Sequence, residues 1–224
     1  MNFQTERELR DSLYEQFARI CKALGSARRF ELISLLSQGE HSVEQLARET
    51  NMTVANTSQH LQHLKSSRLV LIRRKGVEIY YRLADTTVFN LVQSVQFLAN
   101  SQLAEVDRIV DELVLARADI RLMPTSELEE AIHTNNILII DVRPHSEYQY
   151  AHIEGAISIP LGQLEAEIST IPTGKKIVVY CRNYYSSLSD HAVKYLGEQG
   201  LDVYRLENGF SEWKFQGKEI QSEL

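Results

Sequence analysis

The chain has 224 residues, of which 43% are hydrophobic and 24% charged, with 10 Gly and 4 Pro. This composition excludes a disordered or fibrous protein, and the length suits two domains of about 100 residues each. No run approaches the roughly 18 apolar residues that cross a bilayer, so we expect a cytoplasmic protein that does not enter a membrane. Only two cysteines occur, Cys21 and Cys181. Because they lie far apart, a structural disulfide is not expected.

Charge is distributed unevenly along the chain. Residues 1–85 carry 13 Lys and Arg against 10 Asp and Glu, whereas residues 124–224 carry 8 against 15. Within residues 53–82, six basic residues face a single acidic one, Glu78. A local basic excess in an acidic protein is typical of binding to DNA phosphates. A solvated charged surface is the alternative, and charge alone does not separate the two.

The first quarter of the chain predicts a series of helices. Apolar residues recur at helical spacing over 6–24, and residues 26–39 predict a second helix. Ser42 and Gln45 form a capping-box pattern that opens a short third helix, and a tight turn separates it from a fourth over 53–67. Two short helices joined by a turn of about three residues form a helix-turn-helix.

The next segments predict a wing and a long helix. Residues 68–85 alternate apolar and polar side chains on both sides of Lys75 and Gly76, which indicates a hairpin with a basic tip. Residues 86–117 predict one long amphipathic helix whose apolar face is larger than a small domain needs. We expect this helix and the first helix to form a two-fold homodimer. Packing onto the second domain of the same chain is the alternative.

The pattern changes near residues 121–125, which predicts domains over 1–118 and 119–224. Beyond this point short β-branched runs alternate with helical segments. The runs cover residues 135–143, 156–160, 175–181 and 202–209, and the helical segments 126–134, 161–170 and 189–200. This order is typical of an α/β domain with a mostly parallel sheet, in which chemistry lies at the carboxyl ends of the strands.

Cys181 lies at such a strand end, directly before a helix. Backbone N–H groups of the intervening loop and of the helix N-terminus favour a thiolate there. Arg182 adds positive charge, and the hydroxyls of Ser186 and Ser187 are expected to cap the helix and to donate to a bound oxyanion. An inert core cysteine is the alternative.

The second domain resembles the rhodanese family of sulfurtransferases over almost all of 119–224. The motifs are IDVRPHSEY, AHIEGAISIP, VVYCR with its loop, and LENGFSEWKFQGKEI. The resemblance implies that Cys181 is a nucleophile that carries sulfane sulfur as a persulfide, taken from a donor such as thiosulfate. It also implies roles in binding sulfite and the persulfide for the loop residues Arg182, Asn183, Tyr184, Tyr185 and Ser186. By the same resemblance Asp141 and Arg143 brace the loop, and His152 packs locally.

Four residues of the loop limit its chemistry. Phosphatases and arsenate reductases on this fold end a C-x5-R loop in arginine, but the corresponding position here is Ser187, which disfavours both activities. Tyr184 and Tyr185 are bulky and predict a narrow or shielded pocket. Regulator-linked rhodaneses often have a second cysteine where this chain has Ser186, so a disulfide within the loop is excluded.

The first domain resembles the ArsR family of dimeric winged-helix repressors over roughly residues 10–115. The motifs are LGSARRFELISLL, TSQHLQHLKSSRLV and IRRKGVEIYYRL. The resemblance implies that the second helix of the helix-turn-helix enters the major groove, and that the wing contacts the DNA backbone or the minor groove. The helix residues are Asn56, Thr57, Gln59, His60 and His63, and the wing residues are Arg73, Arg74 and Lys75.

Metal sensing, well known in that family, is not expected here. Ser42 and Glu44 replace the C-x-C motif of thiolate sensors, and the pair His60 and His63 lacks a third ligand nearby in sequence. The sequence therefore predicts neither a metal site nor a cofactor. Cys21 lies on an apolar helix stripe and is expected to be buried.

Taken together, these patterns predict a homodimeric repressor that binds double-stranded operator DNA. Persulfidation of Cys181 by a sulfane-sulfur donor is expected to shift the dimer between DNA-competent and DNA-incompetent states. Two alternatives stay open: a protein that is mainly a thiosulfate-type sulfurtransferase, and a degenerate rhodanese domain that serves only as a binding module.

Overall fold

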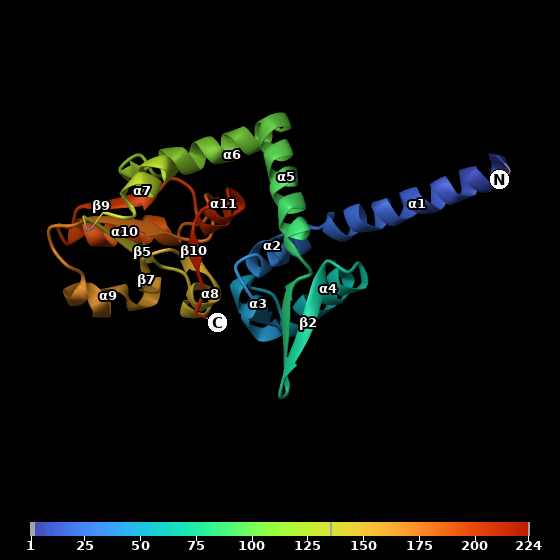
Figure 1. The fold of residues 1–224 in the computed structure, drawn as a ribbon, viewed down its shortest axis with the longest axis horizontal. Coiled ribbons are helices and arrows are strands. Elements are labelled where there is room, and N and C mark those ends of the chain that lie inside the picture. The colour runs from blue at the N-terminus through green and yellow to red at the C-terminus, as the bar shows by residue number, and fades with distance from the viewer. Residues whose placement is uncertain (1–2, 135, 224) are drawn as a thin grey trace. The chain divides into compact units, whose positions relative to one another are not determined.

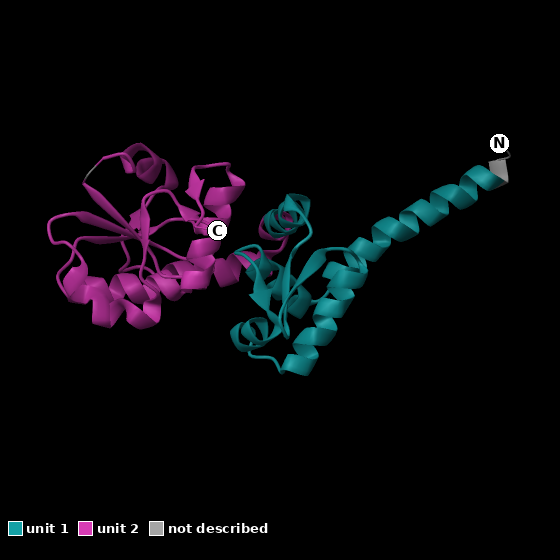
Figure 2. Ribbon diagram, turned by 60° about the horizontal axis from the view of Figure 1, so that its bottom comes forward, with its two compact units in different colours: residues 1–97 teal, residues 98–224 magenta. Residues whose placement is uncertain are grey.

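The structure is a computed structural model that describes residues 3–134 and 136–223. Figure 1 shows its helices and strands in chain order. The chain divides into two compact units, residues 1–97 and 98–224, which are coloured separately in Figure 2. The helix Thr86–Gln102 runs from the first unit into the second. The domain boundary expected near residue 118 stays a prediction.

The first unit contains the expected series of short helices and a hairpin. Its elements are α1 (Phe3–Leu24), α2 (Ala27–Leu36), β1 (His41–Ser42), α3 (Val43–Glu49), α4 (Val54–Ser66), β2 (Val70–Lys75), β3 (Glu78–Leu83) and the start of α5 (Thr86–Gln102). The predicted capping box opens α3, because Ser42 Oγ accepts a hydrogen bond from the Gln45 amide at 3.2 Å and Gln45 Oε1 accepts one from the Ser42 amide at 2.7 Å. The helix-turn-helix is thus present as α3 and α4.

A three-stranded sheet of order β1-β3-β2 follows the helix-turn-helix. Strands β2 and β3 are antiparallel, with Lys75 opposite Glu78, and Gly76 takes a left-handed conformation (φ 63°) at the tip. Arg68, between α4 and β2, is also left-handed (φ 59°), a conformation that usually favours glycine after a helix. The winged helix is confirmed.

The core of the first unit lies among α2, α3 and α4. Leu32, Ile33, Leu46, Leu61 and Leu64 have no exposed surface. Among residues 5–24 of α1, by contrast, Ala23 near the carboxyl end is the one residue that belongs to this core, with partly buried apolar neighbours. The long amino-terminal part of α1 therefore packs against little else in the unit.

The prediction of one continuous helix over residues 86–117 is wrong, because the helix is interrupted. The structure has two helices, α5 and α6 (Ala104–Leu115), and Leu103 between them has an extended backbone (φ −112°, ψ 105°). The preceding Asn100-Ser101-Gln102 has polar side chains that compete with helical hydrogen bonds, and Ser101 Oγ donates to the Leu98 carbonyl at 3.1 Å. The helical spacing of apolar residues continues through residues 100–103, so this spacing did not reveal the break.

The second unit is an α/β domain. After α6 its elements are β4 (Leu122–Met123), α7 (Thr125–Ala131), β5 (Ile137–Asp141), α8 (His145–Tyr150), β6 (His152–Ile153), β7 (Ala156–Ser158), η1 (Leu161–Gln163), α9 (Leu164–Glu167), η2 (Ile168–Thr170), β8 (Lys176–Tyr180), α10 (Leu188–Glu198), β9 (Val203–Leu206), α11 (Phe210–Phe215) and β10 (Ile220–Gln221). All neighbouring strands in the sheet β4-β9-β8-β5-β7 are parallel, as expected. The helix expected over 161–170 is broken into η1, α9 and η2.

Alternation along the central strand β8 separates two cores. Ile177 and Val179 belong to the core that includes residues of α10, whereas Val178 and Tyr180 belong to the core that includes residues of α8 and α11. The sheet is therefore covered on both faces, and its carboxyl edge is where Cys181 leaves β8. In the part of the chain that the structure describes, no helix combines the length and apolar character that a membrane crossing requires.

Candidate functional site

Cys181 follows the central strand and is completely buried in the described structure. Its Sγ atom lies 2.9 Å from Ser189 Oγ, in the first turn of α10. Two carbonyl oxygens, those of Asn183 and Ser186, lie at 3.6 Å. These neighbours suit a neutral thiol that donates hydrogen bonds, because carbonyl oxygens repel a thiolate.

The expected cradle of amide groups around the sulfur is wrong for this loop conformation. Three of the loop amides are used elsewhere: the Tyr185 amide donates to Asn183 Oδ1 at 3.1 Å, the Ser186 amide to the Asn183 carbonyl at 3.2 Å, and the Tyr184 amide to Glu212 Oε1 at 3.4 Å. With these donors engaged, the loop turns carbonyls toward Cys181. Stabilising an anionic sulfur therefore requires the loop to rearrange.

Arg182 does not leave its charge free for the sulfur. Its guanidinium forms a two-pronged ion pair with Glu147, with Nε at 3.0 Å and Nη2 at 2.6 Å from Oε1. The Glu147 side chain has no exposed surface, so the pair is the natural neutralisation of a buried carboxylate. Arg182 thereby ties the start of the loop to α8.

Of the two serines expected to cap α10, Ser186 bonds the first helical amide and Ser187 does not use its side chain. Ser187 occupies the N-cap position but its side chain makes no capping hydrogen bond. Ser186 Oγ accepts a hydrogen bond from the Leu188 amide at 3.5 Å. Ser187 is exposed, so it contributes to the loop through its backbone, whose carbonyl accepts from the His191 amide at 3.1 Å.

Asp141 and Arg143 form a buried ion pair at the carboxyl end of β5. Arg143 Nε donates to Asp141 Oδ1 at 2.9 Å, and Nη2 donates to the Ala151 carbonyl at 2.8 Å. The Tyr180 hydroxyl donates to Asp141 Oδ2 at 2.6 Å, and burial raises the pKa of Tyr180 well above its usual value. Because Tyr180 directly precedes Cys181, this network positions the strand end from which the loop starts.

Residues of the motif LENGFSEWKFQGKEI pack against the Cys181 loop. A Cβ atom at Gly209 would overlap the backbone of Arg182 and Asn183, so the close approach requires glycine. Glu212 accepts a hydrogen bond from the Gly209 amide at 3.0 Å in addition to the one from Tyr184. Burial raises the pKa of Glu212.

His152 has a local packing environment. Its ring stacks on Tyr148 with centroids 3.7 Å apart, and its Nδ1 lies 2.8 Å from the Tyr148 carbonyl oxygen. The ring is buried. This arrangement agrees with the expected role of His152 in local packing.

The helix α4 presents part of the predicted DNA-contacting set. Asn56, Gln59 and His63 are exposed, whereas Thr57 is completely buried and its Oγ1 donates to the Thr53 carbonyl at 3.0 Å. Thr57 therefore faces the core and cannot read a base. His60 is half-buried; burial and, next, the nearby Arg29 lower its pKa below the usual value for histidine.

The three basic residues of the wing are exposed but not equivalent. Arg73 Nε donates to Glu40 Oε2 at 2.9 Å, and its guanidinium carbon lies 5.3 Å from the centroid of the Tyr80 ring. Arg74 and Lys75 lie at the tip beside Gly76. DNA contact by Arg73 thus competes with an existing ion pair, whereas Arg74 and Lys75 extend toward solvent.

Two family models match the chain. Residues 26–71 match "Bacterial regulatory protein, arsR family", and residues 124–216 match "Rhodanese-like domain". An HTH-type transcriptional regulator of Mycobacterium tuberculosis is 38% identical over 211 residues, which cover 92% of this chain and 90% of that protein. The chain belongs to the ArsR-family regulators that carry a rhodanese-like domain.

Two further proteins match one unit each. A thiosulfate sulfurtransferase, GlpE of Shewanella oneidensis, is 32% identical over 41% of this ArsR-rhodanese chain and 89% of its own length. A solved homodimeric winged helix-turn-helix DNA-binding domain of Mycobacterium bovis is 43% identical, with a TM-score of 0.40, and covers 42% of this chain and 86% of its own.

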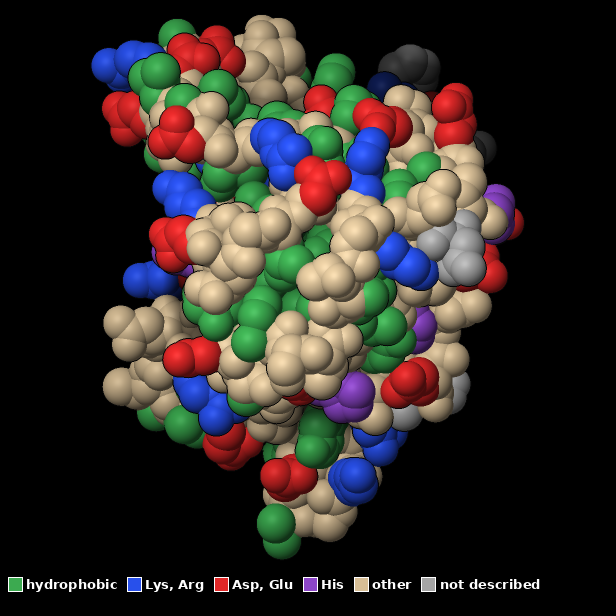
Figure 3. All heavy atoms as spheres, turned by 90° about the vertical axis from the view of Figure 1, so that its left-hand side faces the viewer, with side chains coloured by type: hydrophobic (Ala, Val, Ile, Leu, Met, Phe, Trp, Pro, Cys, Tyr) green, Lys and Arg blue, Asp and Glu red, His purple; other side chains and the backbone are tan. Residues whose placement is uncertain are grey.

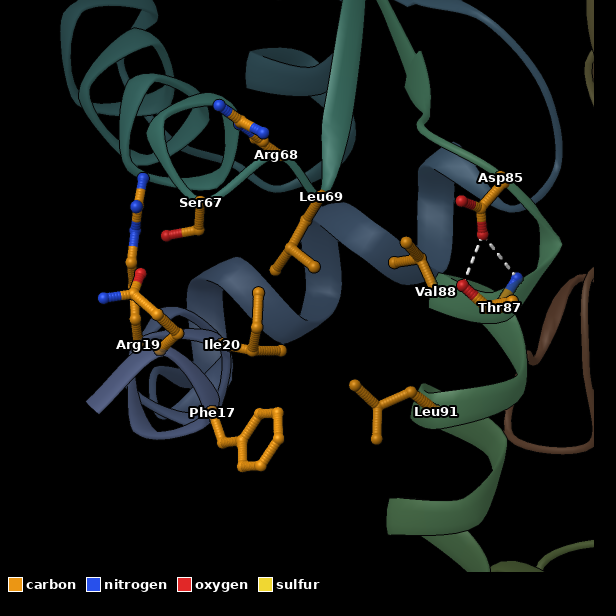
Figure 4. Close-up of a pocket in the computed structure, with 11 residues that line it drawn as sticks. Phe17, Arg19, Ile20, Ser67, Arg68, Leu69, Asp85, Thr87, Val88 and Leu91 are labelled. Carbon is orange, nitrogen blue, oxygen red and sulfur yellow. Dashed lines mark hydrogen bonds between the residues drawn. The ribbon is translucent and has the colours of Figure 1, made fainter. Parts of the chain in front are cut away.

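Cys21 of this ArsR-family regulator is exposed, contrary to expectation. The apolar stripe of α1 on which it lies is exposed too, with Leu13 52% and Phe17 55% accessible. Figure 4 shows Phe17 and Ile20 of α1 and Leu91 of α5 around an open cavity. The volume of this cavity is about 560 Å³. The sequence indicated an apolar stripe correctly, and in the part of the chain that the structure describes its side chains are exposed.

Sequence reasoning missed several residues that shape the Cys181 loop of this regulator. Glu147, Ser189 and Glu212 each contact the loop, but sequence analysis assigned a role to none of them; Glu147 entered only as a residue of the motif IDVRPHSEY. The available signal for Glu147 was a carboxylate within a motif that is otherwise expected to be buried, because such a carboxylate needs a basic partner.

On the face of the molecule in Figure 3, acidic and basic side chains are interspersed, so no single negative patch dominates that face.

Proposed function

We propose that this regulator is a homodimeric repressor whose affinity for operator DNA depends on the sulfur state of Cys181. The observation that carries the proposal is the position of Cys181, which is the first residue after the central strand of a rhodanese-like domain joined to an ArsR-type winged helix. Such a switch requires a loop that carries sulfur and a DNA-binding domain, and we propose that this chain combines both.

The chemistry proposed at Cys181 is a single sulfur transfer. The thiol loses its proton, and the thiolate attacks the outer sulfur of thiosulfate. A sulfur–sulfur bond forms to Cys181, the sulfur–sulfur bond of thiosulfate breaks, and sulfite leaves with the electron pair. A persulfide anion then occupies the loop. An alkyl persulfide or polysulfide transfers sulfur in the same way, with a thiolate or a shorter polysulfide as the leaving group.

The loop must change shape for this step. Cys181 is completely buried, and the carbonyls of Asn183 and Ser186 face its sulfur. A persulfide anion is larger than a thiol and is repelled by those carbonyls, so persulfidation and the observed loop conformation exclude each other. This incompatibility supplies the two loop states that a switch needs.

DNA binding is assigned to α4 and the wing. Asn56, Gln59 and His63 are the exposed residues of α4 that we propose to enter the major groove, and Arg74 and Lys75 are proposed to contact the DNA backbone. We also propose that α1 and α5 form the dimer interface, because their apolar side chains are exposed in a single chain.

The test compares the wild type with Cys181→Ser. An operator is first selected from a pool of random DNA duplexes, and both proteins are then treated with thiosulfate or inorganic polysulfide. We expect mass spectrometry to show one added sulfur on the Cys181 peptide and the operator affinity of the wild type alone to change. Persulfidation without any change in operator affinity would reject the switch.

A second candidate function is sulfurtransferase catalysis, which the similarity to thiosulfate sulfurtransferase GlpE favours. A thiosulfate:cyanide assay separates it from the switch. Turnover that exceeds that of Cys181→Ser supports an enzyme. If the protein shows no turnover and Cys181 acquires no sulfur, the rhodanese-like domain is a binding module. The complete burial of Cys181 would then explain its lack of reaction.

A further inference from the structure

Two buried arginines contact carbonyl groups of the Cys181 loop. Arg205, in β9, donates from Nη2 to the Tyr184 carbonyl at 2.8 Å. Arg117, just beyond the end of α6, donates from Nη2 to the Ser186 carbonyl at 3.5 Å. Their side chains are 1% and 6% exposed. Both belong to the same compact unit as the loop.

One carboxylate joins the two arginines. Asp190, in the first turn of α10, accepts from Arg117 Nε at 2.9 Å on Oδ2, and its Oδ1 lies 2.7 Å from Arg205 Nε. The Tyr184 ring adds a further contact, with guanidinium carbons at 5.2 Å and 5.8 Å from its centroid. Two guanidinium groups around one carboxylate hold the Tyr184–Ser186 part of the loop from the end of α6 and from β9.

The Ser186 carbonyl connects this cluster to the sulfur. It faces Cys181 Sγ at 3.6 Å and Arg117 Nη2 at 3.5 Å. A loop that turns this carbonyl away from a persulfide anion must therefore also change its contact with Arg117. Arg117 Nη1 is buried and has no hydrogen-bond partner among residues 3–134 and 136–223, so a donor remains for a rearranged loop.

Arg117 lies outside both segments that the family models match, 26–71 and 124–216. We infer that Arg117 is a positioning residue that holds the Cys181 loop closed and links the conformation of this loop to helix α6. The link to DNA binding rests on the proposed function, but loop closure does not, because it concerns contacts within residues 98–224.

Loop closure is tested by the rate at which iodoacetamide alkylates Cys181 in the full chain. The variants Arg117→Gln and Arg117→Lys are compared in a Cys21→Ser background, because Cys21 is exposed and would react too. Arg108→Gln is the matched control, since Arg108 is exposed on α6. We expect Arg117→Gln to react about tenfold faster, because local opening exposes the thiol, and the control to react at the wild-type rate.

Arg117→Lys distinguishes positioning from charge. Lysine keeps a positive charge opposite Asp190 but loses the second donor that reaches Ser186, so the rate is expected to fall between those of wild type and Arg117→Gln. If circular dichroism shows that Arg117→Gln does not fold, the alkylation rate of Arg117→Lys alone tests loop closure. An alkylation rate within about twofold of wild type in every folded variant overturns the inference.

Operator binding provides the second readout. Untreated Arg117→Gln is expected to bind the operator like the wild type, but its affinity should no longer respond to persulfidation. If the wild type itself does not respond, the proposed function fails while the alkylation result still decides loop closure. If Arg117→Gln responds as fully as the wild type, the link from Arg117 to DNA binding is wrong.

Discussion

Arg143 and Asp141 form a buried ion pair in which each residue stabilises the charge of the other. Neither side chain has any exposed surface, and burial opposes the charge on Arg143 while the adjacent Asp141 carboxylate more than compensates and raises its pKa. The guanidinium also lies 4.0 Å from the centroid of the Phe210 ring. Each charge is tolerated in the interior because the other is present.

Arg143→Met is expected to destabilise the second unit by about 3–5 kcal/mol, because it leaves the Asp141 charge buried without its partner. Arg121→Met is the matched control, since Arg121 and Asp202 are each 52% exposed and their pair contributes less than about 1 kcal/mol. Urea unfolding followed by Trp213 fluorescence measures both, because Trp213 is the single tryptophan and is buried in this unit. Equal losses would contradict the argument.

Glu212 predicts a pH dependence of stability. Burial raises its folded-state pKa above the unfolded value of 4.5, so the folded state retains the proton to higher pH. The contribution of Glu212 to stability is therefore complete below pH 4.5 and is lost as pH rises through the folded-state pKa. Above pH 4.5 the wild type should lose stability relative to Glu212→Gln as pH rises, in Trp213-monitored unfolding.

The exposed Glu165→Gln serves as the control for the loss of one carboxylate. Its stability relative to the wild type should not show the same trend. If Glu212→Gln instead loses stability relative to the wild type as pH rises, the carboxylate form is the one that the loop stabilises, and the sign of the argument is wrong.

At the scale of elements, the recognition helix and the wing follow local rules. The capping box of α3 and the glycine turn of the wing involve residues close in sequence, and both form as local patterns predict. The N-cap of α4, Thr53, is equally local. Which side chains face DNA depends instead on packing. Thr57 lies on α4 but faces the core, and Arg73 lies on the wing but pairs with Glu40.

The wing arginines should therefore differ in their contribution to DNA binding. Arg74→Gln is expected to weaken operator binding and to reduce the dependence of log K on log salt by about one, which corresponds to one lost phosphate contact. Arg73→Gln should have a smaller effect, because Arg73 is already paired with Glu40. Fluorescence anisotropy over a salt series measures both slopes. A larger change for Arg73→Gln would show that its ion pair opens on DNA.

At the scale of the whole molecule, the exposed apolar surface of α1 is the observation on which the proposed homodimer rests. Leu9, Leu13, Tyr14 and Phe17 are each more than half exposed, and the cavity between α1 and α5 is open. An apolar stripe of this extent is unusual on a monomer. The proposed dimer covers it.

Phe17→Glu is expected to weaken the dimer by about 10- to 100-fold in Kd, because burying a phenylalanine contributes about 1.5–3 kcal/mol. Sedimentation equilibrium measures this, and operator affinity should fall with it. Leu122→Glu, a matched change at a half-exposed residue of the second unit, is the control. An unchanged association constant for Phe17→Glu would place the interface elsewhere.

By itself, the sequence determined the winged helix, the parallel α/β domain and the position of Cys181 at a strand end. These features depend on period, capping and turn residues, which act over a few neighbouring positions. The tertiary structure alone decided the direction of the loop carbonyls, the exposure of Cys21 and the contact of Arg117 with the loop. These depend on partners distant in sequence, such as Glu147, Asp190 and Glu212, whose side chains and burial no local pattern encodes.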